Sequence, residues 1–134
     1  MRQLQAGLAK VNDLNEPSSL AVVDQGGNLV AFARSDNAGF GTTDVAINKA
    51  YTAAAFKSAT ADLYAEAQPG GEIFGISNAG GVRPFVIFGG GVPIMRGRNC
   101  VGAVGVSGGP IVADLAISRA MADALYPLAQ VPTT

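Results

Sequence analysis

Hydrophobic residues in the N-terminal part of the chain repeat with two different periods. Over residues 2–14 they recur at helical spacing, which predicts an amphipathic helix. Residues 19–24 and 28–34 form two strand-like apolar runs, and the connection Gln25-Gly26-Gly27 between them is typical of a hairpin. The chain is therefore predicted to begin with a helix followed by two antiparallel strands.

A polar, glycine-rich loop over residues 35–42 precedes the next helical segment. The loop ends at a run of candidate N-cap residues, 42–44, so a helix is predicted to begin there and to extend to Phe56. Alanines form one face of that helix, and such small residues allow very close packing on a sheet. A shorter helix is predicted over residues 60–67, and residues 72–84 are predicted to form a loop that has room for a short turn of helix.

Three more strands and a helix are predicted toward the C-terminus. Residues 85–88 are a short apolar run typical of a buried strand, and residues 92–96 and 99–106 predict a second hairpin. Gly109-Pro110 marks the start of the final helix, because proline is suited to the first helical position. The packing face of that helix is expected to consist of Ile111, Leu115, Ala122 and Leu125.

The order of these elements is that of an α+β protein. Short connections between the strands favour an antiparallel sheet over a doubly wound parallel one. We therefore expect a single domain over residues 1–134, with a five-stranded antiparallel sheet and helices on both of its faces.

The composition narrows the classes of partner. The formal net charge is −1 and only 14% of residues are charged, so no basic field for a nucleic acid is expected. No segment reaches the run of about 20 apolar residues that crosses a bilayer, so we expect a soluble, cytoplasmic protein. The single cysteine, Cys100, cannot form an intramolecular disulfide. With so few charges, part of the apolar surface is expected to face other copies of the chain in a homo-oligomer.

The chain contains no histidine, which removes the usual general base and the commonest metal ligand. The acidic residues are scattered, so no metal site is expected. The glycine-rich stretch from Gly89 to Gly109 instead predicts a place that another backbone or a ligand approaches closely. The amides of Ser107-Gly108-Gly109 precede the final helix, where they can bind an anion or a carbonyl oxygen.

Lys49 lies within the alanine face of its helix, where its ammonium group needs a polar partner. One interpretation is that its stem packs on apolar surface and its head reaches water. The other is that it reaches the glycine-rich stretch and holds a carboxylate or carbonyl oxygen, with a pKa lowered by burial. Ser107 is a candidate nucleophile, for which Lys49 would be the base in a chain without histidine.

Four further polar residues are candidates for contacts with a ligand, and each also has an ordinary structural explanation. Asn28 lies in the first hairpin turn, where asparagine is a common turn former. Arg34 and Asp36 follow the second strand and would otherwise form a solvated ion pair. Asp114 lies in the first turn of the final helix, where the helix dipole favours a carboxylate.

Four segments form a distinctive combination, namely VVDQGGNLVAFARSDNAG, the helix around Lys49-Ala50, GGGVPI, and VGAVGVSGG followed by Asp114. Together they resemble the GlcG/HbpS-like family, a domain also found as the C-terminal part of PduO-type proteins and described as haem-degrading or haem-binding. The resemblance covers about residues 4–125. It implies a profilin-like fold with a five-stranded antiparallel sheet, association with haem or a corrinoid, and assembly into homo-oligomers such as octamers.

The chain departs from the family pattern at two positions. Asn28 stands where the family usually has histidine, and Ser35 stands where it usually has methionine. An axial bond to haem iron would therefore have to come from Met95, Met121, a tyrosine, Lys49 or Cys100. We favour a small organic ligand over haem, in a glycine-lined pocket whose candidate ligand-binding residues are Asn28, Arg34, Gly89, Gly90, Gly91, Gly108 and Asp114.

Two other functions remain open. One is a metal-free isomerase, lyase or hydrolase, in which Lys49 and the Ser107-Gly108 amides polarise a substrate carbonyl with help from Asp36 or Arg34. The candidate catalytic residues are then Lys49, Ser107 and Asp36. The other is a purely structural partner subunit.

Overall fold

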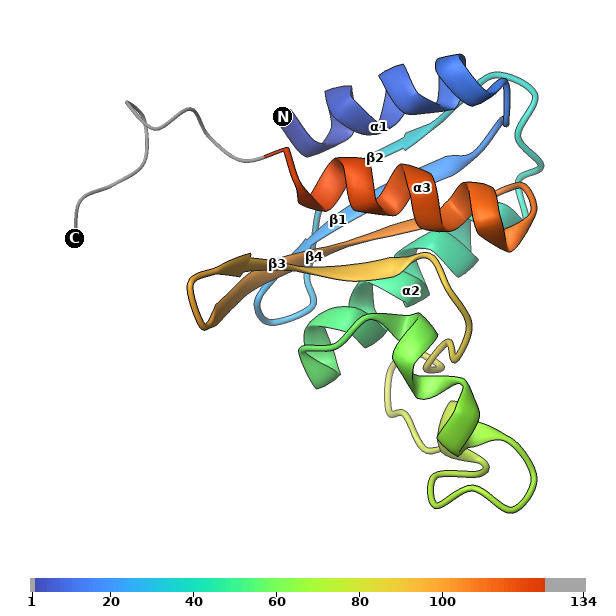
Figure 1. The fold of residues 1–134 in the computed structure, drawn as a ribbon, viewed down its shortest axis with the longest axis vertical. Helices are drawn as coiled ribbons and strands as arrows, with labels where there is room; N and C mark the ends of the chain where they lie inside the picture. Colours follow the sequence, from blue (N-terminus) through green and yellow to red (C-terminus); the bar gives the residue numbers. More distant parts are fainter. Residues whose placement is uncertain (1, 125–134) are drawn as a thin grey trace.

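The computed structural model of the protein describes residues 2–124 of the 134. Figure 1 shows an antiparallel sheet between helices, with the segment that follows α2 extending away from the sheet. The elements are α1 (Arg2–Leu14), β1 (Ser19–Asp24), β2 (Leu29–Arg34), α2 (Thr42–Phe56), β3 (Gly91–Arg96), β4 (Asn99–Ser107) and α3 (Ile111–Ala122). The α+β class and the predicted bounds of α1, α2 and the two hairpins are confirmed.

The described residues form a four-stranded sheet with the strand order β2-β1-β4-β3. All three pairs of neighbours are antiparallel, with Ser19 of β1 opposite Ser107 of β4 at one end and Asp24 opposite Gly102 at the other. Register shifts in β2–β1 and β3–β4 pairing occur near the Asp24 end. Such irregularities increase the local twist of strands.

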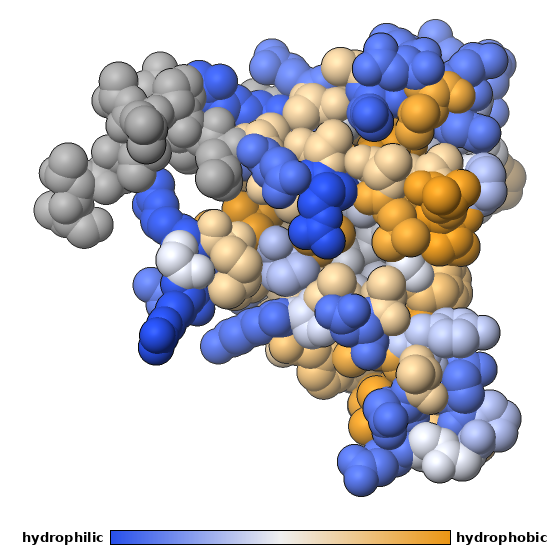
Figure 2. All heavy atoms as spheres, viewed as in Figure 1, coloured by the Kyte–Doolittle hydropathy of each residue, from blue (hydrophilic) through white to orange (hydrophobic). Residues whose placement is uncertain are grey.

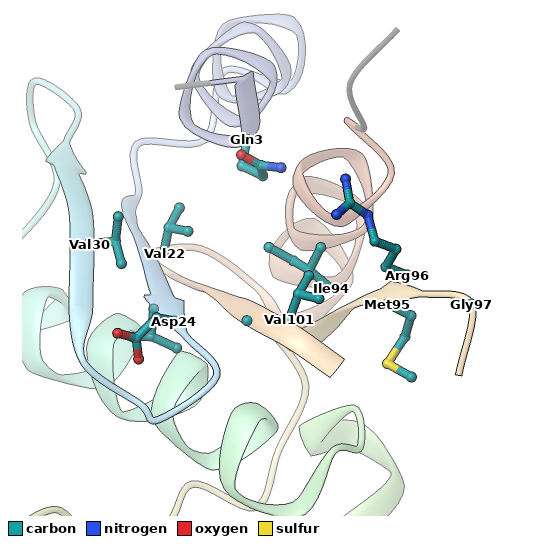
Figure 3. Close-up of a pocket in the computed structure, with 11 residues that line it drawn as sticks. Gln3, Val22, Asp24, Val30, Ile94, Met95, Arg96, Gly97 and Val101 are labelled. Atoms are coloured by element: carbon teal, nitrogen blue, oxygen red, sulfur yellow. The ribbon is translucent and has the colours of Figure 1, made fainter. Parts of the chain in front are cut away.

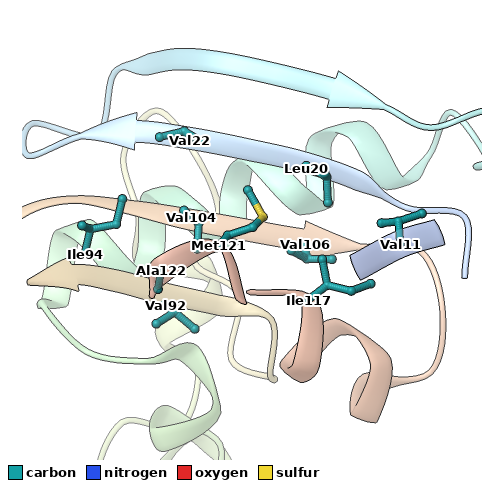
Figure 4. Close-up of a cluster of buried hydrophobic side chains, with 10 residues drawn as sticks. All are labelled: Val11, Leu20, Val22, Val92, Ile94, Val104, Val106, Ile117, Met121 and Ala122. Carbon is teal, nitrogen blue, oxygen red and sulfur yellow. The ribbon is translucent and has the colours of Figure 1, made fainter. Parts of the chain in front are cut away.

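Helices cover both faces of the sheet, as predicted. Because side chains alternate across a strand, one face presents an aliphatic set to α1 and α3, shown in Figure 4, and the other presents smaller residues to α2. The first cluster consists of Val11, Leu20, Val22, Val92, Ile94, Val104, Val106, Ile117, Met121 and Ala122. The alanine face of α2 packs on the second face, as its composition predicts.

The predicted fifth strand, over residues 85–88, is wrong. The backbone N–H of Val86 donates to the hydroxyl oxygen of Thr52 on α2 at 2.9 Å, and not to a neighbouring strand. Phe85 packs its ring against Tyr51 and Phe56 of the same helix, at centroid distances of 6.1 and 4.7 Å. This apolar run therefore covers α2 and does not extend the sheet.

The predicted helix over residues 60–67 is replaced by two short 3-10 helices, Thr60–Leu63 and Ala65–Ala67, and a third, Ile76–Asn78, lies in the predicted loop. The hydroxyl of Thr60 accepts a hydrogen bond from the backbone N–H of Gly91 at 2.9 Å. This bond ties the start of the protruding segment to the beginning of β3. The 3-10 geometry is typical of short connecting pieces.

The packing face of α3 differs from the predicted one. Ala122 is buried, but Ile111 and Leu115 are 41% and 40% exposed, and Leu125 lies outside the described residues. The side chains that α3 buries are Ala113, Asp114, Ile117, Ser118, Met121 and Ala122. An ion pair holds the Asp114 side chain toward the core. The helix is therefore rotated about its axis so that Asp114 faces inward, which the hydrophobic pattern alone does not predict. Pro110 is the N-cap rather than the first helical residue, and Gly41 is the N-cap of α2.

No helix among residues 2–124 is both long and apolar enough to cross a bilayer.

Candidate functional site

Lys49 is buried under the glycine-rich start of β3, with a side-chain exposure of 1%. Its ammonium group donates to the Val106 carbonyl oxygen at 2.8 Å and to Asp114 Oδ2 at 3.0 Å. The Phe88 ring covers it, with Nζ 5.1 Å from the ring centroid. Of the two interpretations of Lys49, the one in which its head reaches water is contradicted, and its predicted proximity to the glycine-rich stretch is confirmed.

The buried environment opposes the charge on both members of this ion pair. Burial lowers the pKa of the Lys49 ammonium below its ordinary value, and the attraction of the Asp114 carboxylate offsets part of that effect. Burial likewise raises the pKa of Asp114, and the Lys49 charge and hydrogen bond oppose the rise. The pair persists because each group supplies the hydrogen bond and counter-charge that the other has lost to desolvation.

The glycines around Lys49 allow close packing between elements. Gly90 has φ +125°, and a Cβ there would lie 2.6 Å from both Lys49 Nζ and the Val106 carbonyl oxygen. A Cβ on Gly91 would meet the Lys49 backbone and, at 2.6 Å, the Thr60 side chain. A Cβ on Gly89 would lie 2.8 Å from Leu115 of α3. The space beside these glycines is therefore filled by protein atoms.

Ser107 and Gly108 lie next to this cluster. Ser107 is 8% exposed, and within the described residues the side-chain hydrogen bonds of Lys49 go to Val106 and Asp114. Lys49 therefore does not donate to the Ser107 hydroxyl. A Cβ on Gly108 would meet the backbone of Pro17 and Ser18, so this glycine packs against the segment that precedes β1.

Asn28 is placed at the opposite end of the sheet from Ser107. The Asp24 carboxylate accepts hydrogen bonds from the backbone N–H of Gly26 and of Asn28, each at 2.9 Å, and from the Asn28 side chain. These bonds, above all the one from the Asn28 backbone, lower the pKa of Asp24. Asn28 thus stabilises the first hairpin turn together with Asp24.

Arg34 and Asp36 are also separated from Lys49 in the fold. Arg34 ends β2 opposite Ser19 and is exposed, and Asp36 is exposed in the following turn. Since β1 lies between β2 and β4, the backbone of Arg34 is about 10 Å from β4. The candidate residues therefore divide into one cluster around Lys49, the Asn28 turn, and the end of β2. Their roles in binding or catalysis stay predictions.

A pocket that the sequence does not predict lies at the Asp24 end of the sheet, below the N-terminus of α1 (Figure 3). Its volume is about 460 Å³. We call it the α1 pocket. Its apolar walls include Val22, Val30, Ile94 and Val101, and its polar lining includes Gln3, Asp24 and Arg96. In the sequence these residues belong to separate predicted elements, namely two hairpins and a helix. The alternation of side chains along the strands that contain Val22 and Ile94 was the one signal in the sequence that could have indicated the pocket.

The side chains around the α1 pocket differ in direction. In Figure 3, Gln3 reaches the pocket from α1, and Val22 and Val30 lie across it from Ile94 and Val101. The Arg96 guanidinium and the Asp24 carboxylate lie on opposite sides, and the Met95 thioether points away from Ile94 and Arg96. The pocket therefore offers an apolar surface with a cation at one margin.

Among residues 2–124, no group of three or more cysteine, aspartate or glutamate side chains is arranged to hold a metal ion. That the whole chain lacks a metal site stays a prediction. Within the same residues, every buried side-chain nitrogen or oxygen has a hydrogen-bond partner. The buried polar groups are thus already used by the fold.

The described residues form a small α+β domain, with a four-stranded antiparallel sheet between helices, a buried lysine–aspartate pair and a hollow of about 460 Å³ at one end of the sheet. Residues 2–123 match the model of the family described as haem degrading protein HbpS-like. The chain belongs to this HbpS-like family. The family predicted from the sequence motifs is therefore confirmed, whereas the profilin-like assignment stays a prediction.

Three relatives illustrate the family. The chain is 37% identical over 122 residues to an uncharacterized 15.0 kDa protein in the dhaT-dhaS intergenic region of Citrobacter freundii, covering 91% of this chain and 85% of that protein. It is 32% identical over 117 residues to the corrinoid adenosyltransferase PduO of the same organism, covering 86% of this chain but 34% of PduO. A crystal structure of a PduOC:heme complex superposes with a TM-score of 0.88 and 29% identity, covering 92% of this chain and 89% of that one.

Proposed function

We propose that the protein binds a flat, largely apolar organic molecule of the tetrapyrrole class in the α1 pocket. The observation that carries this proposal is an apolar-walled hollow of about 460 Å³ with few polar groups at its margin. Pockets that hold small organic molecules have these properties and volumes of about 300–1,000 Å³. The PduOC:heme complex adds support, because a relative with the same fold binds heme.

The arrangement of side chains favours a ligand held by its ring and not by a bond to iron. Among the described axial candidates, Met95 alone lines the pocket, and in Figure 3 its thioether points away from Ile94 and Arg96, while Met121 is fully buried in the core. Lys49 is paired with Asp114, and the Cys100 thiol donates to the Gly102 carbonyl oxygen. Tyr51 stacks near Phe85. We therefore expect the metal-free porphyrin and the iron porphyrin to bind with affinities of the same order.

The same observations bear on the alternative of a metal-free enzyme. A carbonyl-polarising Lys49 would need an ammonium group that substrate can reach, and this group is closed off by Asp114, Val106 and Phe88. Its residual exposure is 1%. The function that we propose is therefore binding without turnover. In this proposal Lys49 does not contact the ligand and has a structural role.

A titration tests the proposal with two probes, haemin and metal-free protoporphyrin IX. Both are expected to saturate wild-type protein. The variant Val101→Glu is expected to lower both affinities about tenfold or more, because an apolar pocket strips water from the new carboxylate. Val101 is 42% exposed, so the variant should fold. Val82→Glu, at a residue that is 92% exposed on the protruding segment, is the matched control and should bind as wild type does.

Three results would count against this function. Wild-type protein that binds neither probe has no tetrapyrrole site. Binding that is unaffected by Val101→Glu would place the site elsewhere on the molecule. Binding of haemin without binding of protoporphyrin IX would instead require an axial bond to iron.

We also propose that the chain forms homo-oligomers through the exposed apolar part of α3. Ile111, Val112 and Leu115 are 41%, 73% and 40% exposed, and Figure 2 shows hydrophobic side chains gathered over this part of α3. Contiguous exposed apolar residues of this kind are typical of protein–protein contacts. Gly89, which precedes β3, adjoins the patch, because a Cβ there would lie 2.8 Å from Leu115 and 3.1 Å from Ile111.

Light scattering on purified protein is expected to give a mass that is a multiple of that of one chain. Val112→Glu should shift the mass toward a single chain, because it places a charge in the proposed contact. Ala9→Glu, at an exposed position of α1, is the control and should leave the mass unchanged. A wild-type mass equal to one chain at micromolar concentration would refute the assembly.

A further inference from the structure

Arg96 lies between two neighbouring hollows of the surface. It lines the α1 pocket, and it also lines a second hollow of about 750 Å³ between the C-terminal end of α2 and the turn that connects β3 to β4. Val101 is likewise shared by both. The α1 pocket is therefore continuous with the second hollow at Arg96 and Val101, and the two hollows differ in the polarity of their lining.

The second hollow is cationic. Lys57 and Arg98 line it together with Arg96, and none of the residues that line it is acidic. The remaining polar lining consists of neutral groups such as Gln25 and Asn99. Three like charges around one concave surface raise the local positive potential and attract an anion, although the net charge of the chain is −1.

These three cations are not neutralised within the part of the chain that the structure describes. The ion pair between side chains of residues 2–124 is the one that Lys49 forms with Asp114, at the other end of the sheet. The nearest carboxylate in the α1 pocket, that of Asp24, accepts hydrogen bonds from Gly26 and Asn28 in the hairpin turn. Asp24 also lies across the pocket from Arg96 (Figure 3).

We infer that Arg96, with Arg98 and Lys57 beside it, binds an acidic group of the ligand, so that the ligand is an organic acid and not a neutral hydrophobic molecule. The inference rests on the proposed function, because it assigns the ligand's apolar body to the α1 pocket. The acidic group is then directed to the Arg96 side, since Asp24 repels it from the opposite side. Arginine suits this role because its planar guanidinium can donate two parallel hydrogen bonds to one carboxylate.

The test compares protoporphyrin IX, which carries two carboxylates, with its dimethyl ester, which has the same ring and no charge. Fluorescence titrations of both are made in the same low-salt buffer with the same cosolvent. Wild-type protein is expected to bind the acid about tenfold or more tightly than the ester, as hydrogen bonds to charged groups predict. Added salt should reduce that preference, because Arg96 and its neighbours are exposed.

Variants assign the preference to these residues. Arg96→Gln is expected to weaken binding of the acid about tenfold and to leave ester binding unchanged, which also shows that the pocket is intact. Arg98→Gln should have a smaller effect in the same direction. Lys10→Gln is the matched control, because it also removes one positive charge but lies two helical turns away from Gln3, the residue of α1 that lines the pocket. This variant should bind both probes as wild type does.

The outcomes separate this inference from the proposed function. Equal binding of acid and ester by wild-type protein would overturn the inference and leave the tetrapyrrole proposal in place. An equal loss in Lys10→Gln and Arg96→Gln would also overturn it, because the preference would then follow the total charge. Failure of both probes to bind wild-type protein would refute the proposed function itself.

Discussion

Lys49→Met is expected to lower the free energy of unfolding by about 3–5 kcal/mol at neutral pH, because it leaves the buried Asp114 carboxylate without its counter-charge. Asp114 is 2% exposed, so water cannot replace the lost partner without opening the structure. The Val106 carbonyl oxygen loses the same donor. Urea denaturation of wild type and variant, fitted to a two-state transition, measures the effect.

Two further variants show whether the loss comes from the broken pair. Lys57→Met removes an exposed lysine and is expected to change stability by no more than about 0.5 kcal/mol. Replacing both partners, by Lys49→Met with Asp114→Leu, should recover more than half of the loss, since no buried charge remains. A double variant as unstable as Lys49→Met alone would mean that the cost comes from altered packing.

The loss in Lys49→Met is also expected to depend on pH. In that variant the pKa of Asp114 should rise further, because the Lys49 charge and hydrogen bond that oppose the rise are gone. A carboxyl group whose pKa is raised by folding stabilises the folded state below its unfolded pKa and loses this contribution as the pH rises through its folded pKa. The destabilisation should therefore be largest near neutral pH and shrink toward the ordinary aspartate value of 3.8. A loss that is the same at every pH would contradict an ionised Asp114.

Gly105→Ala is expected to destabilise the protein by about 3 kcal/mol or more. Gly105 lies on β4 directly below α2, and a Cβ there would overlap the Ala46 carbonyl oxygen and lie 2.6 Å from the Ala50 nitrogen. Both neighbours are backbone atoms of a regular helix, so α2 would have to move off the sheet. Thermal and urea unfolding of the variant measure the effect.

A second glycine provides the control for Gly105→Ala. A Cβ on Gly39 would meet no atom within 4 Å, so Gly39→Ala is expected to stay within about 1 kcal/mol of wild type. If Gly105→Ala were equally mild, then α2 would not be held against β4 as closely as the structure describes.

Elements whose partners are close in sequence were predictable. The hairpin of β1 and β2 depends on a two-strand pattern and a turn within a few residues, and Asp24 and Asn28 support that turn locally. The run over residues 85–88 has the composition of a buried strand, yet it packs on α2. Its apolar side chains require burial, but composition does not specify whether a strand or a helix provides it.

The candidate site divides in the same way. Lys49 attracts attention in the sequence because it lies on an alanine face, which left its ammonium group either in water or at the glycine-rich stretch, and the structure places it at the glycine-rich stretch. Its partner Asp114 is 65 residues away, where the sequence offers only a helix-dipole explanation. The α1 pocket combines a helix end with parts of two hairpins, so no single segment carries a signal for it.

The sequence by itself determined the family, the α+β class, the helices on both faces and the bounds of most elements, because hydrophobic period, turn residues and motif spacing act over short stretches of chain. Only the tertiary structure decided the number of strands in the described sheet, the rotation of α3, the partner of Lys49 and the place of the pocket. Each of these depends on which surfaces meet across the fold. Buried charge pairing and close backbone contacts at glycines select among arrangements that the same local pattern allows.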